Sequence, residues 1–234
     1  MRPRRKRDLA AAALIALGMA ASAPSAHVAA AQAAPAPVPV LLVPGWFDSG
    51  RDMAALRLFL VSSGWTPESV VALSFEHPTG SNRAHAEEIR RAVEALQEKT
   101  GSDVVDMVAH SMGGLAVRWY LAHGGSARRV VFLATPQRGT WAAYLAWGAG
   151  GDEMEPSSPF LDSLNAYPSV PPGVEALTVR TPMDTHILPG ESATLPGVPD
   201  VIVCCPSHAG MLRDTRIFRV VRRFLLEGEV SRGG

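Results

Sequence analysis

One serine in this chain stands in a turn that few sequences can adopt. Residues 103–109 have the pattern of a buried strand, and residues 112–122 have the pattern of a helix. Between them, Ala109 to Gly113 nearly match G-x-S-x-G, in which a tight strand-to-helix turn holds a serine hydroxyl out at the edge of a sheet. Alanine replaces the first glycine of that pattern. We therefore expect Ser111 to stand at the carboxyl end of a strand.

The composition indicates one globular domain. The chain has 234 residues, of which 47% are hydrophobic and 19% are charged, so it can bury a sizeable core. Its 22 basic and 22 acidic residues cancel, and the one dense basic cluster lies within the first seven residues. We therefore expect no nucleic-acid partner.

The first residues have the layout of a secretory signal peptide. Basic residues precede an apolar run from Leu9 to about Ala21, and A-x-A sites follow at residues 21–23 and 31–33. The run is shorter than the roughly 20 residues that span a bilayer, so an uncleaved anchor is the less favoured alternative. We expect a signal peptide over residues 1–33, a Pro/Ala-rich linker over 34–39 and the folded domain over 40–228, in a secreted protein whose export route stays open.

Strand and helix patterns alternate through the folded domain. Strands are expected over residues 40–43, 70–75, 103–109, 129–134, 174–180 and 201–204, and helices over 53–62, 82–99, 112–122 and 215–226. The second helix, for example, has apolar residues at Ile89, Val93 and Leu96, and Gly101 stands where a helix C-cap belongs. Strands joined through helices predict an α/β fold with a mostly parallel sheet covered on both faces.

A serine hydroxyl becomes a useful nucleophile only beside a base, which a third group must orient. His208 lies after the last expected strand and before the final helix, where the base belongs in the chain order serine, acid, histidine. Asp184 follows the strand over residues 174–180, in the position expected for the acid. The sequence thus predicts Ser111, Asp184 and His208 as catalytic residues.

Other residues compete for these roles. His186 is the weaker rival for the base, and His110 is expected to point away from the serine and to pack. Asp152, Asp162 and Asp200 are rivals for the acid. The first two lie in a stretch rich in Gly, Ser and Pro, and the third directly precedes a strand, so Asp184 is preferred.

Two backbone N–H groups are needed to stabilise the oxyanion that forms when a serine attacks a carbonyl. Met112 should supply one, because it directly follows the serine. The turn after the first strand should supply the other through Trp46, since Pro44 has no N–H and Gly45 lets the backbone approach closely. Trp46 and its neighbour Phe47 can also pack against the sheet or the substrate without losing this role.

Residues 137–172 form the longest stretch without a clear strand pattern. In such a fold an insertion of this kind can cover the active site. Trp141, Tyr144 and Leu145, together with Phe47, are therefore candidate substrate-binding residues that line an acyl pocket or form a small lid. An ordinary helix that packs these rings on the core is an equal alternative, so the length of the acyl group that the site accepts stays open.

Four stretches together resemble the α/β-hydrolase superfamily and, within it, the small secreted bacterial triacylglycerol lipases of the lipase A-like, class 2 group. These stretches are VLLVPGWFDS, DMVAHSMGGLAVRWYL, VVFLATPQRGT, and RTPMDTHILPGESATLPGV leading into SHAGML. The resemblance implies an α/β-hydrolase fold of minimal size without a large cap, and a secreted serine ester hydrolase. It also implies Ser111 as nucleophile, Asp184 as orienting acid and His208 as base. Many relatives have His-Gly in place of Pro44-Gly45, whereas the small lipases share Ala109.

The sequence predicts no cofactor, because Cys, His and carboxylate residues do not occur at a recognisable metal-ligand spacing. The expected partner is a small-molecule or lipid ester, with contact to a lipid interface. An acyltransferase that uses the same triad and a catalytically silent binding protein are the alternatives. The natural ester and the oligomeric state stay open.

The chain has only two cysteines, Cys204 and Cys205, which are adjacent. Neighbouring cysteines can join only in a strained ring, so we expect two buried thiols rather than a disulfide. A redox switch beside His208 is the less favoured alternative.

Overall fold

A computed structural model describes residues 36–228. The expected signal peptide and the first two residues of the expected linker lie outside this range, so both stay predictions. Among the described residues, no helix combines the length and the apolar character that crossing a membrane requires.

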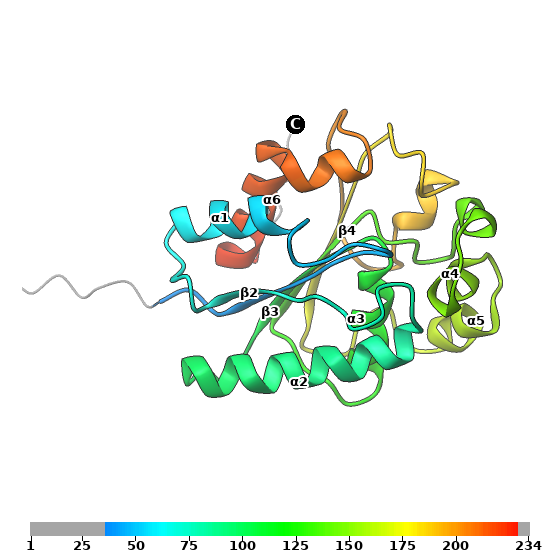
Figure 1. Cartoon of the computed structure of the whole chain (residues 1–234). Helices are drawn as coiled ribbons and strands as arrows, with labels where there is room; N and C mark the ends of the chain where they lie inside the picture. The colour runs from blue at the N-terminus through cyan, green and yellow to red at the C-terminus, as the bar shows by residue number, and fades with distance from the viewer. Residues whose placement is uncertain (1–35, 229–234) are drawn as a thin grey trace, which may run out of the picture. The chain divides into compact units, whose positions relative to one another are not determined.

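Six strands form one sheet in the order β2-β1-β3-β4-β5-β6, and every pairing between neighbours is parallel (Figure 1). The strands are β1 (Val40–Val43), β2 (Val70–Ala72), β3 (Asp106–His110), β4 (Arg129–Leu133), β5 (Glu175–Arg180) and β6 (Asp200–Ile202). In the middle of the sheet, Leu42 of β1 is opposite Val108 of β3, which is opposite Val131 of β4. The expected parallel sheet is confirmed. Five of the six strands start within one residue of the expected position, and β3 starts three residues later than expected.

Two helices cover each face of this sheet (Figure 1). Helices α1 (Ala54–Ser62) and α6 (Thr215–Glu227) lie on one face, and α2 (Asn82–Thr100) and α3 (Gly113–Ala122) lie on the other. Side chains of a strand alternate between the faces, so Val40 and Leu42 pack with α1 and α6, whereas Leu41 and Val43 pack with α2 and α3. All four helices are close to the expected ranges, and Gly101 caps α2 in a left-handed conformation, as predicted.

Some strands are shorter than expected because the neighbouring strand offers no further backbone groups for pairing. Strand β1 has four residues because Pro39 precedes it and Pro44 follows it. Strand β3 therefore begins at Asp106, which is opposite the first residue of β1, rather than at residue 103. Strand β2 ends at Ala72, which is opposite Leu42, one residue before the end of β1.

The segment between β4 and β5 contains no strand, as expected. It forms a 3-10 helix η1 (Trp141–Leu145) and two short helices, α4 (Ala149–Met154) and α5 (Pro159–Asn165). Two further 3-10 helices, η2 (Gly190–Ala193) and η3 (Ala209–Arg213), flank β6. These five elements are too short for a reliable hydrophobic period, which explains why the sequence patterns did not predict them.

Candidate active site

Ser111 occupies the tight turn that joins β3 to α3. Its backbone has a φ of 52°, a left-handed conformation that non-glycine residues rarely adopt. The Ser111 N–H donates a hydrogen bond of 2.8 Å to the carbonyl of Leu133 at the end of β4, which holds the turn against the sheet. A side chain at Gly113 would collide with the Pro44 carbonyl, so α3 begins close to the turn after β1. The expected strand-to-helix turn at Ser111 is therefore present.

The loops after β5 and β6 bring Asp184 and His208 together. The Nδ1 atom of His208 lies 2.8 Å from Oδ2 of Asp184, so this nitrogen carries the proton and donates to the carboxylate. The other carboxylate oxygen, Oδ1, accepts hydrogen bonds from the backbone N–H groups of His186 and Ile187, at 2.8 and 3.0 Å. These contacts fix both the carboxylate and the imidazole ring, which are largely buried.

Burial has a direct effect on the protonation of this pair. Removal from water lowers the pKa of His208, an effect larger than the opposing influence of the Asp184 hydrogen bond. For Asp184, burial acts to raise the pKa, but the His208 hydrogen bond and the amides of Ile187 and His186 outweigh it and lower the pKa below its ordinary value. At neutral pH the site thus holds a neutral imidazole, the form that accepts a proton, beside a carboxylate anion.

Ser111 and His208 line one cavity of about 550 Å³, at the carboxyl ends of the parallel strands. Trp46, Thr140 and Ile187 line other parts of its wall. The Ser111 hydroxyl and His208 are not hydrogen-bonded to each other, and catalytic contacts of this kind often tighten only when a substrate is bound. The cavity therefore gathers the predicted nucleophile and base, and the base holds the predicted acid.

The rival acids lie elsewhere. Asp152 belongs to α4 and Asp162 belongs to the exposed face of α5, and neither lines the cavity. Asp200 begins β6, where its carboxylate accepts hydrogen bonds from Arg180 and Thr178, both at 2.8 Å. Among these carboxylates, only that of Asp184 contacts a histidine.

The two predicted oxyanion donors lie beside Ser111. The N–H of Phe47 is used in a hydrogen bond of 3.0 Å to the Pro78 carbonyl, whereas the N–H groups of Trp46 and Met112 donate to no acceptor in the described part of the chain. A β-carbon at Gly45 would lie 2.9 Å from the Ser111 β-carbon, so the Trp46 turn packs directly on the serine. Trp46 also lines the cavity, and its indole N–H donates to the Trp147 carbonyl at 3.1 Å.

Two further histidines flank the imidazole of His208, and sequence patterns did not predict this arrangement. His110 is buried, as expected, but it lines the cavity rather than only packing in the core. Its ring centre is 4.6 Å from that of His208, and its Nδ1 atom lies 3.4 Å from Oδ2 of Asp48. The ring of His186, an exposed residue, stacks on that of His208, with the ring centres 4.7 Å apart and an interplanar angle of 18°. The available sequence signals were the adjacency of His110 to Ser111 and the position of His186 two residues after Asp184.

Two of the four candidate substrate-binding residues line the cavity. Phe47 and Leu145 line it, whereas Trp141 and Tyr144, on the same helix η1 as Leu145, do not. All four side chains are exposed, Leu145 to 88%, so the alternative in which these rings pack on the core is wrong. Polar contacts of Thr140 hold η1 in place, because its hydroxyl donates to the His186 carbonyl at 2.6 Å and accepts from the Leu188 N–H at 2.8 Å.

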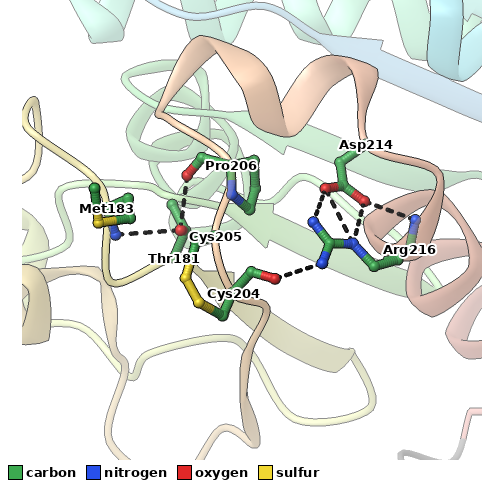
Figure 2. Close-up of a disulfide and its surroundings, with 7 residues drawn as sticks. All are labelled: Thr181, Met183, Cys204, Cys205, Pro206, Asp214 and Arg216. Atoms are coloured by element: carbon green, nitrogen blue, oxygen red, sulfur yellow. Dashed lines mark hydrogen bonds and ion pairs between the residues drawn. A yellow bond between two sulfur atoms is a disulfide. The ribbon is translucent and has the colours of Figure 1, made fainter.

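The two cysteines form a disulfide in an exposed segment between β6 and His208 (Figure 2). The expectation of two buried thiols is therefore wrong. Strand β6 ends at Ile202, so the cysteines extend beyond the sheet and its core. The same segment is held on both sides, since Arg216 donates to the Cys204 carbonyl at 2.6 Å and the Thr181 hydroxyl donates to the Pro206 carbonyl at 2.8 Å (Figure 2).

Solved structures of other proteins share this architecture. The mature form of Bacillus licheniformis lipase BlEst2 superimposes with a TM-score of 0.68 at 17% identity, over 82% of this chain and 93% of that chain. Aspergillus fumigatus lipase B gives a TM-score of 0.70 at 19% identity, over 82% of this chain and 53% of that chain. The lin2722 gene product of Listeria innocua gives 0.62 at 16% identity, over 84% of this chain and 96% of that chain. These matches confirm the α/β-hydrolase fold.

A sequence model of one family also matches. Its description is lipase (class 2), and it matches residues 37–157, just over half of the chain. The matched range contains the turn after β1 and the whole strand-to-helix turn at Ser111. This protein belongs to the class 2 lipase family and is an ester hydrolase.

Proposed function

We propose that this lipase cleaves lipid esters through an acyl-enzyme on Ser111 and that it acts outside the cell. One observation carries the mechanism. Ser111, in its strained turn, and the imidazole of His208 line the same cavity, and that imidazole is hydrogen-bonded to Asp184. A serine, a neutral imidazole and a buried carboxylate in this relation are the parts that acyl transfer to serine requires.

The reaction begins when the Ser111 Oγ atom attacks the ester carbonyl carbon and its proton passes to Nε2 of His208. Asp184 keeps the Nδ1–H bond and balances the charge of the resulting imidazolium. The carbonyl oxygen becomes an oxyanion, which accepts hydrogen bonds from the N–H groups of Trp46 and Met112. The imidazolium then gives its proton to the departing alcohol, which leaves the acyl group on Ser111. A water molecule, deprotonated by His208, releases the acid and restores the serine.

An apolar rim at the cavity supports a lipid ester as substrate and contact with a lipid surface. Three large apolar side chains that line the cavity, Phe47, Leu145 and Trp147, are more than half exposed, and so are Trp141 and Tyr144 on the same helix η1 as Leu145. Exposed apolar side chains gathered around a cavity are typical of surfaces that meet an apolar partner. Trp141, Tyr144 and Trp147 suit the boundary between water and acyl chains, because each side chain combines an apolar body with a polar N–H or O–H group.

Two observations support export. The first residues have the layout of a signal peptide, and the described domain carries an exposed disulfide, a bond that persists mainly in oxidising compartments. Recovery of the active protein from the culture medium, with its N-terminus determined by mass spectrometry, tests this part of the proposal. A protein found only inside cells with Met1 intact would contradict it.

The decisive experiment measures hydrolysis of p-nitrophenyl esters from acetate to palmitate by the wild-type protein and by Ser111→Ala. We expect the variant to lose roughly 10⁶-fold in kcat, the scale of loss for a serine triad, while its circular dichroism and thermal midpoint stay unchanged. A rate that peaks at long acyl chains would support a lipase, and a peak at short chains an esterase. A Ser111→Ala rate equal to wild type would refute the acyl-enzyme, and an ester product in the presence of added alcohol would indicate acyl transfer.

A further inference from the structure

Each of the two oxyanion donors lies beside a residue with a strained backbone. Phe47, which directly follows Trp46, has a φ of 61°, and Ser111, which directly precedes Met112, has a φ of 52°. Both values lie in the left-handed region, which residues other than glycine rarely adopt. Such conformations persist only where surrounding contacts hold them. The contacts that hold these two segments therefore also fix the two N–H groups.

Backbone hydrogen bonds hold the first of these segments within its own loop. The Asp48 N–H donates to the Gly45 carbonyl at 3.2 Å, which closes a four-residue turn, and the Phe47 N–H donates to the Pro78 carbonyl. Pro78 lies between β2 and α2, so neither bond reaches β3, the strand that leads to Ser111. A polar contact between this turn and the end of β3 comes instead from a side chain.

The carboxylate of Asp48 makes this contact with a buried histidine. Its Oδ2 atom lies 3.4 Å from Nδ1 of His110, which ends β3 directly before Ser111. This separation is longer than that of a strong hydrogen bond, so the attraction is mainly electrostatic. Both ring nitrogens of His110 are buried and lack a hydrogen-bond partner within residues 36–228. Because a buried nitrogen without an acceptor is costly, the carboxylate is the group that stabilises a proton on Nδ1.

We propose that Asp48 is a positioning residue, which acts through His110 to hold the two oxyanion donors at the spacing that an oxyanion requires. This inference rests on the proposed function, in which the N–H groups of Trp46 and Met112 bind the oxyanion. The contact joins the two strained segments, since Asp48 belongs to the turn of the first donor and His110 belongs to the strand that leads to the second.

Close packing carries the effect of this pair to the reacting groups. A β-carbon at Gly45 would lie 2.9 Å from the Ser111 β-carbon and 3.2 Å from Nδ1 of His110, so the turn packs on both the serine and the ring. The centre of the His110 ring is also 4.6 Å from that of His208. A shift of the ring therefore displaces the donor turn, and a misplacement of about 1 Å can cost roughly 100-fold in rate.

Kinetics of two Asp48 variants on a p-nitrophenyl ester test the proposal. In Asp48→Ala the turn loses its polar link to β3, and we expect kcat to fall roughly 10- to 100-fold while KM changes little. Asp48→Asn keeps an oxygen acceptor without the charge and should restore most of the lost rate. Asp52→Ala is the matched control, because this carboxylate lies in the same loop but accepts only from Ser49 and does not line the cavity.

Three kinetic outcomes would overturn the proposal. The first is a wild-type kcat in Asp48→Ala, and the second is an equal loss in Asp52→Ala. The third is a rate in Asp48→Asn as low as that in Asp48→Ala, because the effect would then be one of charge rather than of position.

A double-mutant cycle tests whether Asp48 acts through His110. His110→Gln removes the ring, so adding Asp48→Ala to it should cause little further loss of kcat. A double variant whose loss equals the product of the two single losses would show that the residues act independently, against the proposal. Thermal melts check that each variant is folded, and His110→Asn serves as a second variant at this buried position.

Amide NMR spectra separate this inference from the proposed function. The resonance of the Met112 N–H should shift in Asp48→Ala more than in Asp52→Ala, although Met112 lies on the far side of the Ser111 turn from His110. Equal shifts in the two variants would overturn the positioning role. If the wild type hydrolyses no ester, the proposed function fails, but the spectra still decide whether Asp48 positions this group.

Discussion

Oδ2 of Asp184 lies 2.8 Å from Nδ1 of His208, although a 3-10 helix and strand β6 separate the two residues along the chain. The carboxylate also accepts hydrogen bonds from two backbone N–H groups, so its position does not depend on the histidine alone. The acid is therefore pre-positioned, and the imidazole is held in the tautomer that leaves Nε2 free to accept a proton.

Replacement of this carboxylate should remove most of the activity and leave the fold intact. In Asp184→Asn the side chain no longer provides the charge that selects the tautomer, and we expect kcat to fall by roughly 10⁴-fold. Asp162→Asn, at an exposed position on α5, is the control and should retain the wild-type rate. Steady-state kinetics on a p-nitrophenyl ester gives both values. A large loss at Asp162 with little at Asp184 would assign the acid to the other loop.

The turn at Gly45 and Trp46 packs closely on Ser111, and this packing predicts a strong effect of one added methyl group. In Gly45→Ala the new carbon would lie 2.9 Å from the Ser111 β-carbon and 3.0 Å from Oδ2 of Asp48, so the turn must shift. We expect kcat to fall roughly 10²- to 10³-fold through the displaced Trp46 N–H, with a smaller change in KM. Gly190→Ala, where the added carbon meets no atom within 4 Å, should retain the wild-type kcat. Equal rates in the two variants would show that this turn does not supply an oxyanion donor.

The apolar rim should matter for lipid surfaces more than for dissolved esters. Leu145→Ser removes the most exposed large apolar side chain of the rim, and we expect it to lower the rate on emulsified triacylglycerol several-fold more than the rate on p-nitrophenyl acetate. Leu58→Ser changes a leucine that is 64% exposed on α1, away from the cavity, and should affect neither rate. Titration of released acid at constant pH measures the first substrate. The same loss on both substrates would place Leu145 in the acyl pocket rather than at a lipid surface.

His85 is buried and does not line the cavity, and its burial predicts a loss of stability in acid. Burial lowers the pKa of His85 below its ordinary value of 6.5, against smaller opposing effects of the His77 carbonyl and of Glu88 and Glu153; the His77 side chain lowers it slightly further. The unfolded chain thus takes up a proton at a higher pH than the folded chain does. The stabilising contribution of neutral His85 is complete above pH 6.5 and declines as the pH falls from there through the folded-state pKa.

Urea unfolding from about pH 8 to about pH 5 tests this contribution. His85→Gln keeps a donor for the His77 carbonyl, which the His85 Nε2 atom contacts at 2.8 Å, but it cannot be protonated. The unfolding free energy of the variant should therefore decrease less toward acid pH than that of the wild type. Parallel pH profiles for the two proteins would show that His85 does not contribute.

The disulfide predicts a simple chemical result. When the denatured protein is alkylated and its mass measured, neither Cys204 nor Cys205 should be labelled unless a reductant has been added first, after which both should be. Acid quenching before denaturation prevents thiol exchange during the measurement. Labelling of both cysteines without reductant would instead support the two thiols expected from the sequence.

Local patterns were sufficient for the framework of the fold. The spacing of Ile89, Val93 and Leu96 predicted α2 almost to the residue, and the apolar run before Pro44 predicted β1, because each pattern reflects burial on one face or between two layers. The positions of Ser111 after β3, Asp184 after β5 and His208 after β6 also predicted that these residues lie close together, since the carboxyl ends of parallel strands share one edge of the sheet.

Other features depend on contacts between segments that are distant along the chain. The start of β3 at Asp106 depends on the length of β1. The contacts of His186 and His110 with His208 depend on how the loops after β5 and β6 pack against the end of β3. The exposure of Cys204 and Cys205 depends on where β6 ends. The sequence by itself therefore determined the order of strands and helices and the serine turn, because backbone geometry and burial periodicity are local. Only the tertiary structure decided the histidine cluster, the exposed disulfide and the apolar rim, because loops are positioned by packing against the whole sheet rather than by their own residues.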